Sequence, residues 1–218
     1  MAGVHGMMIM GKTSEVVFIN TVNRTQATIH TLMGSPTVAN VYIFENTATI
    51  SAATQGGWAL QTGTFPAGST LKIINHGSIR GGGGNGGALT QNGYDGGTAL
   101  ILDFPTTIDN TSGTIWGGGG GGGGAGGDYA IGGGGGAGVP AGNGGTGTWA
   151  GSAGTSSAGG AGGRNLGTVG GTGGALGSAG GKGDGVGAGA GGRGGYSVQT
   201  NGNAVSWIAV GDRAGPVV

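Results

Sequence analysis

Apolar and polar positions alternate along the first part of the chain, in short runs separated by turn residues. The runs EVVFIN, QATIHTLM, ANVYIFEN and TLKIIN lie between Glu15 and Asn75 and are rich in Val, Ile, Thr and aromatic residues. Alternation with a period of two is typical of half-buried β-strands. The Gly-Ser-Pro and Pro-Ala-Gly stretches between the runs favour turns. The pattern predicts a small β-domain over residues 1–70, with almost no α-helix.

A strand–turn–strand unit occurs twice and is followed each time by a run of glycine. Leu71–Gly87 reads LKIINHGSIRGGGGNGG, and Leu100–Gly127 reads LILDFPTTIDNTSGTIWGGGGGGGGAGG. Each unit has an apolar strand, an Asn-containing turn and a short strand that ends in Ile-Arg or Ile-Trp. A disordered linker gives no reason for entering the glycine twice through the same sequence. The repeat therefore indicates an ordered structure behind the strands.

Glycine in the second part of the chain recurs with a period of three. Of the 64 glycines, 52 lie in residues 81–195. From 171 to 195 every third position is glycine except Val186, and residues 142–163 hold a second register of the same period. This period matches a left-handed extended helix with three residues per turn and no internal hydrogen bonds. Bulkier residues interrupt the glycine at intervals, which indicates short rods joined by turns.

The fold class expected from these patterns is mainly β plus polyglycine-II. Extended glycine helices can approach backbone to backbone and satisfy their amides through lateral hydrogen bonds. A glycine-rich domain over residues 71–218 would hold the packed helices and end in a closing strand.

Composition removes several function classes. The net charge is zero, 7% of residues are charged and cysteine is absent. A chain without a basic patch is not expected to bind nucleic acid, and without a long apolar run it is not expected to insert into a membrane. The first residues lack the pattern of a signal peptide, so we expect synthesis and assembly in a cytoplasm.

No motif for catalysis or for cofactor binding is present. Gly-x-Gly-x-x-Gly patterns arise by accident in such a sequence, and Gly181-Lys182 is not followed by the Ser or Thr of a phosphate loop. The three histidines are isolated, and Asp184 in GGKGDG is one position early for a calcium-binding glycine repeat. We therefore expect no catalytic residue, no metal and no cofactor. A carboxylate pair for glycan cleavage could still be assembled by folding.

These features resemble the glycine-rich adhesins that cap the long tail fibres of T-even-type bacteriophages. The segment from Ile74 to Gly81 is similar to the units through which that family enters its glycine region. The closing segment SVQTNGNAVSWIAVGDRAG, with Trp207, Gly211 and Arg213 in comparable places, is similar to the family's C-terminus. The resemblance covers Leu71 to Gly215. Residues 1–70 do not look like the family's usual attachment domain.

The resemblance implies a receptor-binding virion component without enzymatic activity, at the distal tip of a phage tail or tail fibre and made in the host cytoplasm. Its N-terminal part would attach to a trimeric tail fibre protein. Loops that join polyglycine-II helices would bind the bacterial receptor, either an outer-membrane protein or a surface glycan. Two alternatives remain open at this point: an ice-binding polyglycine-II protein and a glycan-degrading tail enzyme.

The candidate receptor-binding residues are the aromatic, apolar and polar side chains that interrupt the glycine. Loop-borne aromatics beside polar groups are favoured anchors of binding surfaces, although the same side chains could also cap the glycine rods. The candidates are Tyr94, Asp128, Tyr129, Ile131, Val139, Asn143, Trp149, Arg164 and Asn165.

Overall fold

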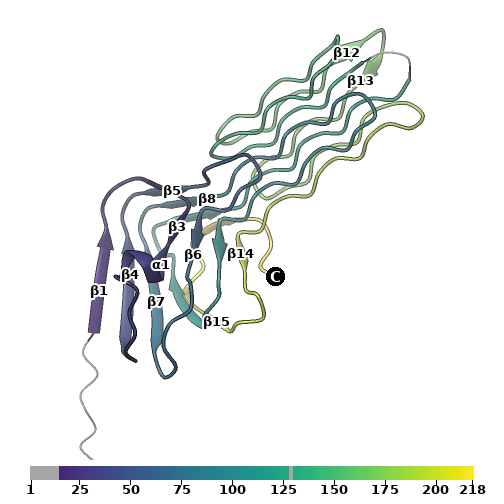
Figure 1. The fold of residues 1–218 in the computed structure, drawn as a ribbon. Coiled ribbons are helices and arrows are strands. Elements are labelled where there is room, and N and C mark those ends of the chain that lie inside the picture. The colour runs from purple at the N-terminus through teal and green to yellow at the C-terminus, as the bar shows by residue number, and fades with distance from the viewer. Residues whose placement is uncertain (1–14, 128–129) are drawn as a thin grey trace, which may run out of the picture.

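Three parallel sheets form a solenoid at one end of the molecule (Figure 1). The computed structural model describes residues 15–127 and 130–218. Sheet A contains β1 (Glu15–Asn20), β4 (Val41–Asn46), β7 (Thr70–Asn75), β10 (Thr106–Asp109) and β15 (Val205–Ala209). Sheet B contains β2 (Arg24–Thr25), β5 (Thr49–Ser51), β8 (Ser78–Arg80), β11 (Thr114–Trp116) and β16 (Asp212–Ala214). Sheet C contains β3 (Ala27–Thr28), β6 (Leu60–Gln61), β9 (Leu100–Ile101) and β14 (Val198–Gln199).

The chain visits sheets A, B and C in turn, so each circuit adds one parallel strand to each sheet. Inward-facing apolar residues of successive circuits stack directly on one another because neighbouring strands pair in register, apart from an irregularity after Ile108 where β10 pairs with β15. These buried stacks form the core and contain Phe44, Ile73 and Ile108 from sheet A, Ile50, Ile79 and Ile115 from sheet B, and Leu60, Leu100 and Val198 from sheet C. The alternating runs of the sequence supply this single buried face.

A ladder of buried asparagines runs along the turn between sheets A and B. Asn20 donates to the Oδ1 atom of Asn46, Asn46 to Asn75, and Asn75 to Asn110, with distances of 2.8, 2.8 and 2.7 Å. Arg24 donates to the first amide, and the last one donates to backbone carbonyls of the final circuit. Each amide therefore has partners on both sides, as a buried polar group requires.

Breaking the ladder is expected to destabilise the solenoid. Asn46→Ala removes the acceptor of the Asn20 side-chain N–H₂ group and the donor to the Asn75 Oδ1 atom, and each buried unsatisfied group costs about 1–3 kcal/mol. Chemical denaturation should show a loss of about 2–3 kcal/mol. Asn23→Ala is the matched control, because its amide is exposed and water replaces the lost bond. Equal stability of the two variants would contradict a structural role for the ladder.

Three of the four predicted N-terminal strand segments are strands, and the fourth is mostly a helix. QATIHTLM contains only the two-residue strand β3, followed by the short helix α1 (Ile29–Leu32). Ile29 is fully buried, and the Met33 N–H donates to its carbonyl. The helix turns the chain at a corner of the solenoid while its one buried side chain joins the core, so tertiary packing overrides the β propensity of this run.

The sheets continue across the predicted boundary at residue 70. Sheet A joins β4 to β7 and β10, which lie on opposite sides of that position, and the C-terminal strands β15 and β16 complete the last circuit. Segments 81–98 and 117–196 leave sheet B and return to sheet C, so the glycine region is inserted into two circuits of the solenoid. We propose to divide the chain at these crossings, since each piece then holds its own packed structure.

The glycine region forms a bundle of extended segments, here called rods. Along the rod 117–126, successive N–H groups donate in rotation to the rods 92–97, 131–137 and 178–183. Gly118 donates to Gly97 and Gly121 to Tyr94, three residues apart on both rods. The carbonyls of the same rod accept in rotation from 81–87, 170–175 and 188–196. This rod is therefore surrounded on all sides by others, which explains why it contains glycine at nearly every position.

The rod 131–137 has the same environment, and the remaining rods form a shell around these two inner rods. Its N–H groups donate to three rods and its carbonyls accept from three others. The shell follows one closed path from neighbour to neighbour and consists of the rods 81–87, 92–97, 188–196, 178–183, 170–175, 159–163, 149–154 and 141–146.

The three-residue registers of the sequence correspond to the inward faces of outer rods. Gly189, Gly192 and Gly195 are buried, whereas Ala190 and Arg193 are exposed. A rod with three residues per turn places every third residue on one side. The structure thus shows a three-residue repeat of hydrogen-bond direction and burial; assignment of the rods as polyglycine-II stays a prediction.

Side chains on an inner rod are expected to break the bundle. A Cβ atom added at Gly121 would overlap the backbone carbonyl of Asn85, which cannot move without displacing its own rod. Gly121→Ala should destabilise the protein by about 3 kcal/mol or more, the upper range of overpacking. At Gly181, on the shell, the nearest atoms to an added Cβ belong to Thr172 at 3.2 Å. Gly181→Ala should shift the thermal unfolding midpoint far less, and equal shifts would contradict the assignment of inner and outer rods.

Candidate functional site: the far end of the glycine bundle

The bundle extends away from the solenoid and ends in a set of turns (Figure 1). The chain leaves the solenoid after Arg80 and Trp116 and then alternates between its near and far ends. The far turns that the structure describes include residues 88–91, 147–148, 164–169 and 184–187. Their backbone geometry is set by the rods on either side, so the turns are held on a rigid frame.

The far turns expose apolar side chains. Leu166 and Val186 are 89% and 97% exposed, more than any other large apolar residue among those described, and Leu89 is also exposed. Leu166 has a φ of 43° and Leu89 the same value, in the left-handed region that disfavours such residues. These side chains contribute nothing to the apolar core of the solenoid.

Two of these turns are tied to each other. The hairpin β12–β13 (Arg164–Asn165 and Thr168–Val169) carries Leu166 at its tip. The carboxylate of Asp184 accepts a hydrogen bond of 3.1 Å from the Val169 N–H, and the Asp184 N–H donates to the Val169 carbonyl. The turn that carries Val186 is thereby fixed beside the hairpin. The two turns that carry the apolar tips are therefore linked by hydrogen bonds.

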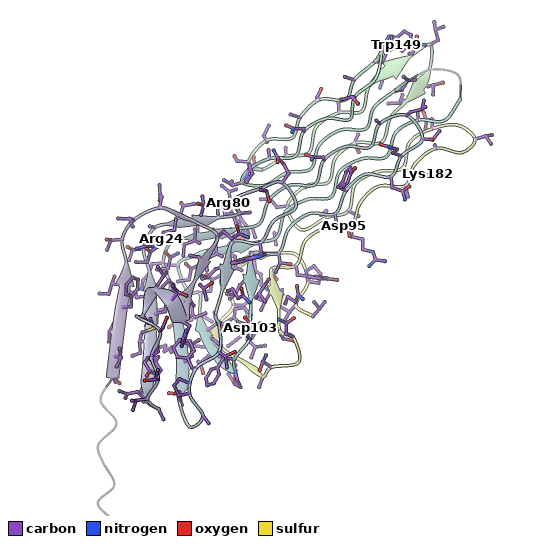
Figure 2. The ribbon with its side chains drawn as sticks, viewed as in Figure 1. Arg24, Arg80, Asp95, Asp103, Trp149 and Lys182 are labelled. Atoms are coloured by element: carbon purple, nitrogen blue, oxygen red, sulfur yellow. The ribbon has the colours of Figure 1, made fainter. Side chains whose placement is uncertain are left out.

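Several predicted contact residues lie at this end. Trp149 is at the far tip of the bundle (Figure 2), where it forms a bridge with Ile131. Arg164 is exposed in β12, and the half-buried Asn165 beside it has a side-chain N–H₂ group without a partner among the described residues. The Ile131 side chain is fully buried at the start of an inner rod, so it supports the tip from below. Asp128 and Tyr129 lie outside the described residues.

The other predicted contact residues lie away from the far turns. Tyr94 is exposed on the flank of the rod 92–97, and Asn143 is exposed on the rod 141–146. Val139 is half-buried in a near-end turn, where it lines a hollow of about 320 Å³ with solenoid residues such as Arg24. Position along the chain does not reveal which turn is near and which is far.

Leu89, Leu166 and Val186 did not stand out in the sequence. Each is a single aliphatic residue beside glycine or a small residue, whereas most of the predicted contact residues are aromatic or polar. Val186 was noted only as a break in the period of three. A usable signal was available: an isolated Leu or Val inside a glycine turn has no core to join.

Polar side chains also join outer rods. The side-chain oxygens of Asn85, Asn92 and Asp95 accept hydrogen bonds of 2.8, 2.8 and 2.6 Å from backbone N–H groups of neighbouring rods. These residues substitute for backbone carbonyls at the edge of the bundle. They account for the Asn and Asp residues that interrupt the early glycine runs.

A family model described as phage tail fibre adhesin Gp38 matches residues 9–218. The chain belongs to this family. The match includes the N-terminal circuits, so the expectation that residues 1–70 depart from the family is wrong. Those circuits repeat the strand and turn pattern of β7 and β8 but lack a glycine insertion. The glycine run that made the later units recognisable is therefore missing from them. The resemblance noted from the glycine region is confirmed, and the protein is a receptor-binding component of a phage tail.

One solved structure is similar over nearly the whole adhesin. It is the gp37–gp38 adhesin tip complex of the bacteriophage S16 long tail fibre, with a TM-score of 0.75 and 26% sequence identity. The similarity covers 95% of this chain and 84% of that one. No curated protein matches.

The described residues of the adhesin contain neither a cluster suited to a metal ion nor a helix suited to a membrane. Within residues 15–127 and 130–218, no group of three or more His, Asp or Glu side chains is placed to hold a metal ion. No helix formed by the same residues has the length and apolar character that a membrane crossing requires.

Proposed function

We propose that this adhesin binds a bacterial surface receptor through the far turns of its glycine bundle and binds its tail fibre protein through the solenoid. The exposed side chains of Leu166 and Val186, on two far turns that Asp184 ties together, carry the proposal. The receptor is an outer-membrane protein or a surface glycan, and binding involves no turnover.

Binding at the far turns would follow from buried apolar area on a rigid frame. Covering an exposed Leu or Val side chain completely contributes about 1.5–3 kcal/mol. The shell rods fix the ends of each turn, so little conformational entropy is lost when the turn docks. Arg164 and Trp149 at the same end supply a cation and an aromatic ring, both enriched at the centres of interfaces.

Charge on the apolar tips is expected to weaken adsorption strongly. Leu166→Glu and Val186→Glu would place a carboxylate where the receptor covers apolar surface, and each should lower the adsorption of phage particles to host cells at least tenfold. Ala190→Glu is the control, since it adds the same charge to an exposed position on the flank of the bundle. Circular dichroism would verify folding. Normal adsorption of both tip variants would exclude this surface as the binding site.

For the fibre partner, the first circuit of the solenoid is the better candidate of its two ends. The edge strand β1 exposes the outward-facing side chains of Val17 and Ile19, each 52% exposed, and its outer edge is unpaired among the described residues. Two hollows adjoin the same end around Arg24 and Thr25. An unpaired strand edge with apolar side chains readily pairs with another chain. The similar S16 structure is a complex of gp38 with gp37.

The two ends of the solenoid can be compared directly. Ile19→Asp in β1 should weaken the complex between the adhesin and its fibre protein about tenfold or more, because it buries an unpaired charge. Ile208→Asp in β15 changes an equally exposed residue, at 58%, on the edge strand of the opposite end. Co-purification of the two proteins measures the effect. Loss of the complex with Ile208→Asp alone would move the attachment surface to the last circuit.

A further inference from the structure

Arg80 connects the solenoid to the glycine bundle through its side chain. The residue ends β8, at the point where the chain leaves sheet B for the first rod. Its guanidinium carbon lies 4.7 Å from the centre of the Trp116 ring, and one of its terminal N–H groups donates to the Ser156 carbonyl at 2.6 Å. Trp116 is on the neighbouring strand, whereas Ser156 is in a near-end turn of the bundle. The side chain therefore crosses between the two parts.

The Trp116 ring is itself fixed from the other side. Its indole N–H donates to the carboxylate of Asp212 at 3.0 Å, on the next strand of sheet B. A guanidinium, an indole ring and a carboxylate thus form a row across three neighbouring strands on the outer surface of sheet B. Stacking of a guanidinium on an indole face is among the stronger cation–π arrangements, and it requires the planar group of arginine.

Part of the Arg80 guanidinium is removed from water in this position. Its Nε atom is buried and has no hydrogen-bond partner among the described residues. Burial lowers the pKa of its guanidinium from the ordinary value, although arginine stays protonated. A free arginine would turn its donors toward water. The arrangement persists because ring stacking and the Ser156 carbonyl hold the group against the bundle.

Other near-end turns rest on sheet B through backbone groups. The Ala52 N–H, just past β5, donates to the Val139 carbonyl at 3.2 Å. The Gly177 N–H donates to the Gly117 carbonyl, directly behind β11. The turn that contains Ser156 lies between these in chain order and is held by the Arg80 side chain.

We propose that Arg80 is the positioning residue of a rigid joint, which fixes the angle of the glycine bundle on the solenoid. The Trp116 ring, itself bonded to Asp212, fixes the orientation of the Arg80 side chain, and the Ser156 carbonyl accepts a hydrogen bond from its guanidinium. With this angle fixed, the orientation of the solenoid also determines the orientation of the far turns. This role does not depend on what the far turns bind.

The experiment measures a distance across the joint in the full-length adhesin. The chain contains no cysteine, so spin labels attach only at Lys182→Cys on the bundle and Ser206→Cys in the solenoid, both exposed positions. Double electron–electron resonance should give one narrow distance distribution with Arg80 present. Arg80→Ala should replace it by a broad one, while the thermal unfolding midpoint changes little. Arg193→Ala, an exposed arginine on an outer rod, should leave the narrow distribution unchanged.

Two further variants keep the test decisive. Trp116→Leu removes the surface on which Arg80 stacks and should broaden the distribution in the same direction. Arg80→Lys keeps the charge but lacks the planar group, so it should also broaden the distribution, and it decides the question if Arg80→Ala does not fold. A narrow distribution in the folded Arg80 and Trp116 variants would overturn the proposal, as would equal broadening by Arg193→Ala.

Discussion

Lateral hydrogen bonding between glycine backbones is the constraint on which the rest of this structure depends. Each inner rod satisfies most of its N–H and C=O groups through six neighbouring rods, and a side chain added at its central glycines would overlap their backbone. The bundle therefore needs no apolar core, and its stability comes from the pairing of buried polar groups. Side chains are confined to the outer faces and to the turns, which is where a surface for recognition can be varied.

The strands of the solenoid place the first residues of several rods next to one another. β8 and β11 are neighbouring parallel strands in register, so the rods that follow them begin side by side. Sheet C receives the returning rods on β9 and β14, which are also neighbours. The spacing of the rods, and the height at which each begins, are thus set by strands that pack on an apolar core. The Asn ladder and the row formed by Arg80, Trp116 and Asp212 stiffen the solenoid near this junction.

The sequence predicts individual strands and glycine rods well, but it predicts poorly which of them lie next to one another. Alternation in VYIFEN and TLKIIN identified β4 and β7, because one face of each strand is buried. The period of three in the glycine indicated packed rods, and the eight glycines behind Trp116 lie in an inner one. The stacking of β1 to β7 into circuits left no motif, because parallel register between distant strands depends on contacts that are far apart in sequence. QATIHTLM is mostly helical because the packing of Ile29 at a corner of the solenoid overrides its β propensity.

The candidate site was predicted in kind and only partly in detail. Interrupted glycine pointed to loops, and Trp149, Arg164 and Asn165 lie at the far end. Tyr94 and Val139 do not, because rods alternate in direction and the sequence does not state which turn faces outward. The exposed tips Leu166 and Val186 were overlooked because isolated aliphatic residues resemble ordinary packing residues until their surroundings are known.

The insertion of the bundle between sheets B and C has a consequence for how the chain folds. Leu100 of β9 pairs with Val198 of β14, so the fourth circuit closes only after nearly the whole glycine region has been made. Closing a flexible loop of that length carries an entropic penalty that grows with the logarithm of its length, and such non-local pairing slows folding. A formed bundle brings the two ends together and removes that penalty. Assembly of the rods thus favours closure of the last two circuits by bringing β9 and β14 together.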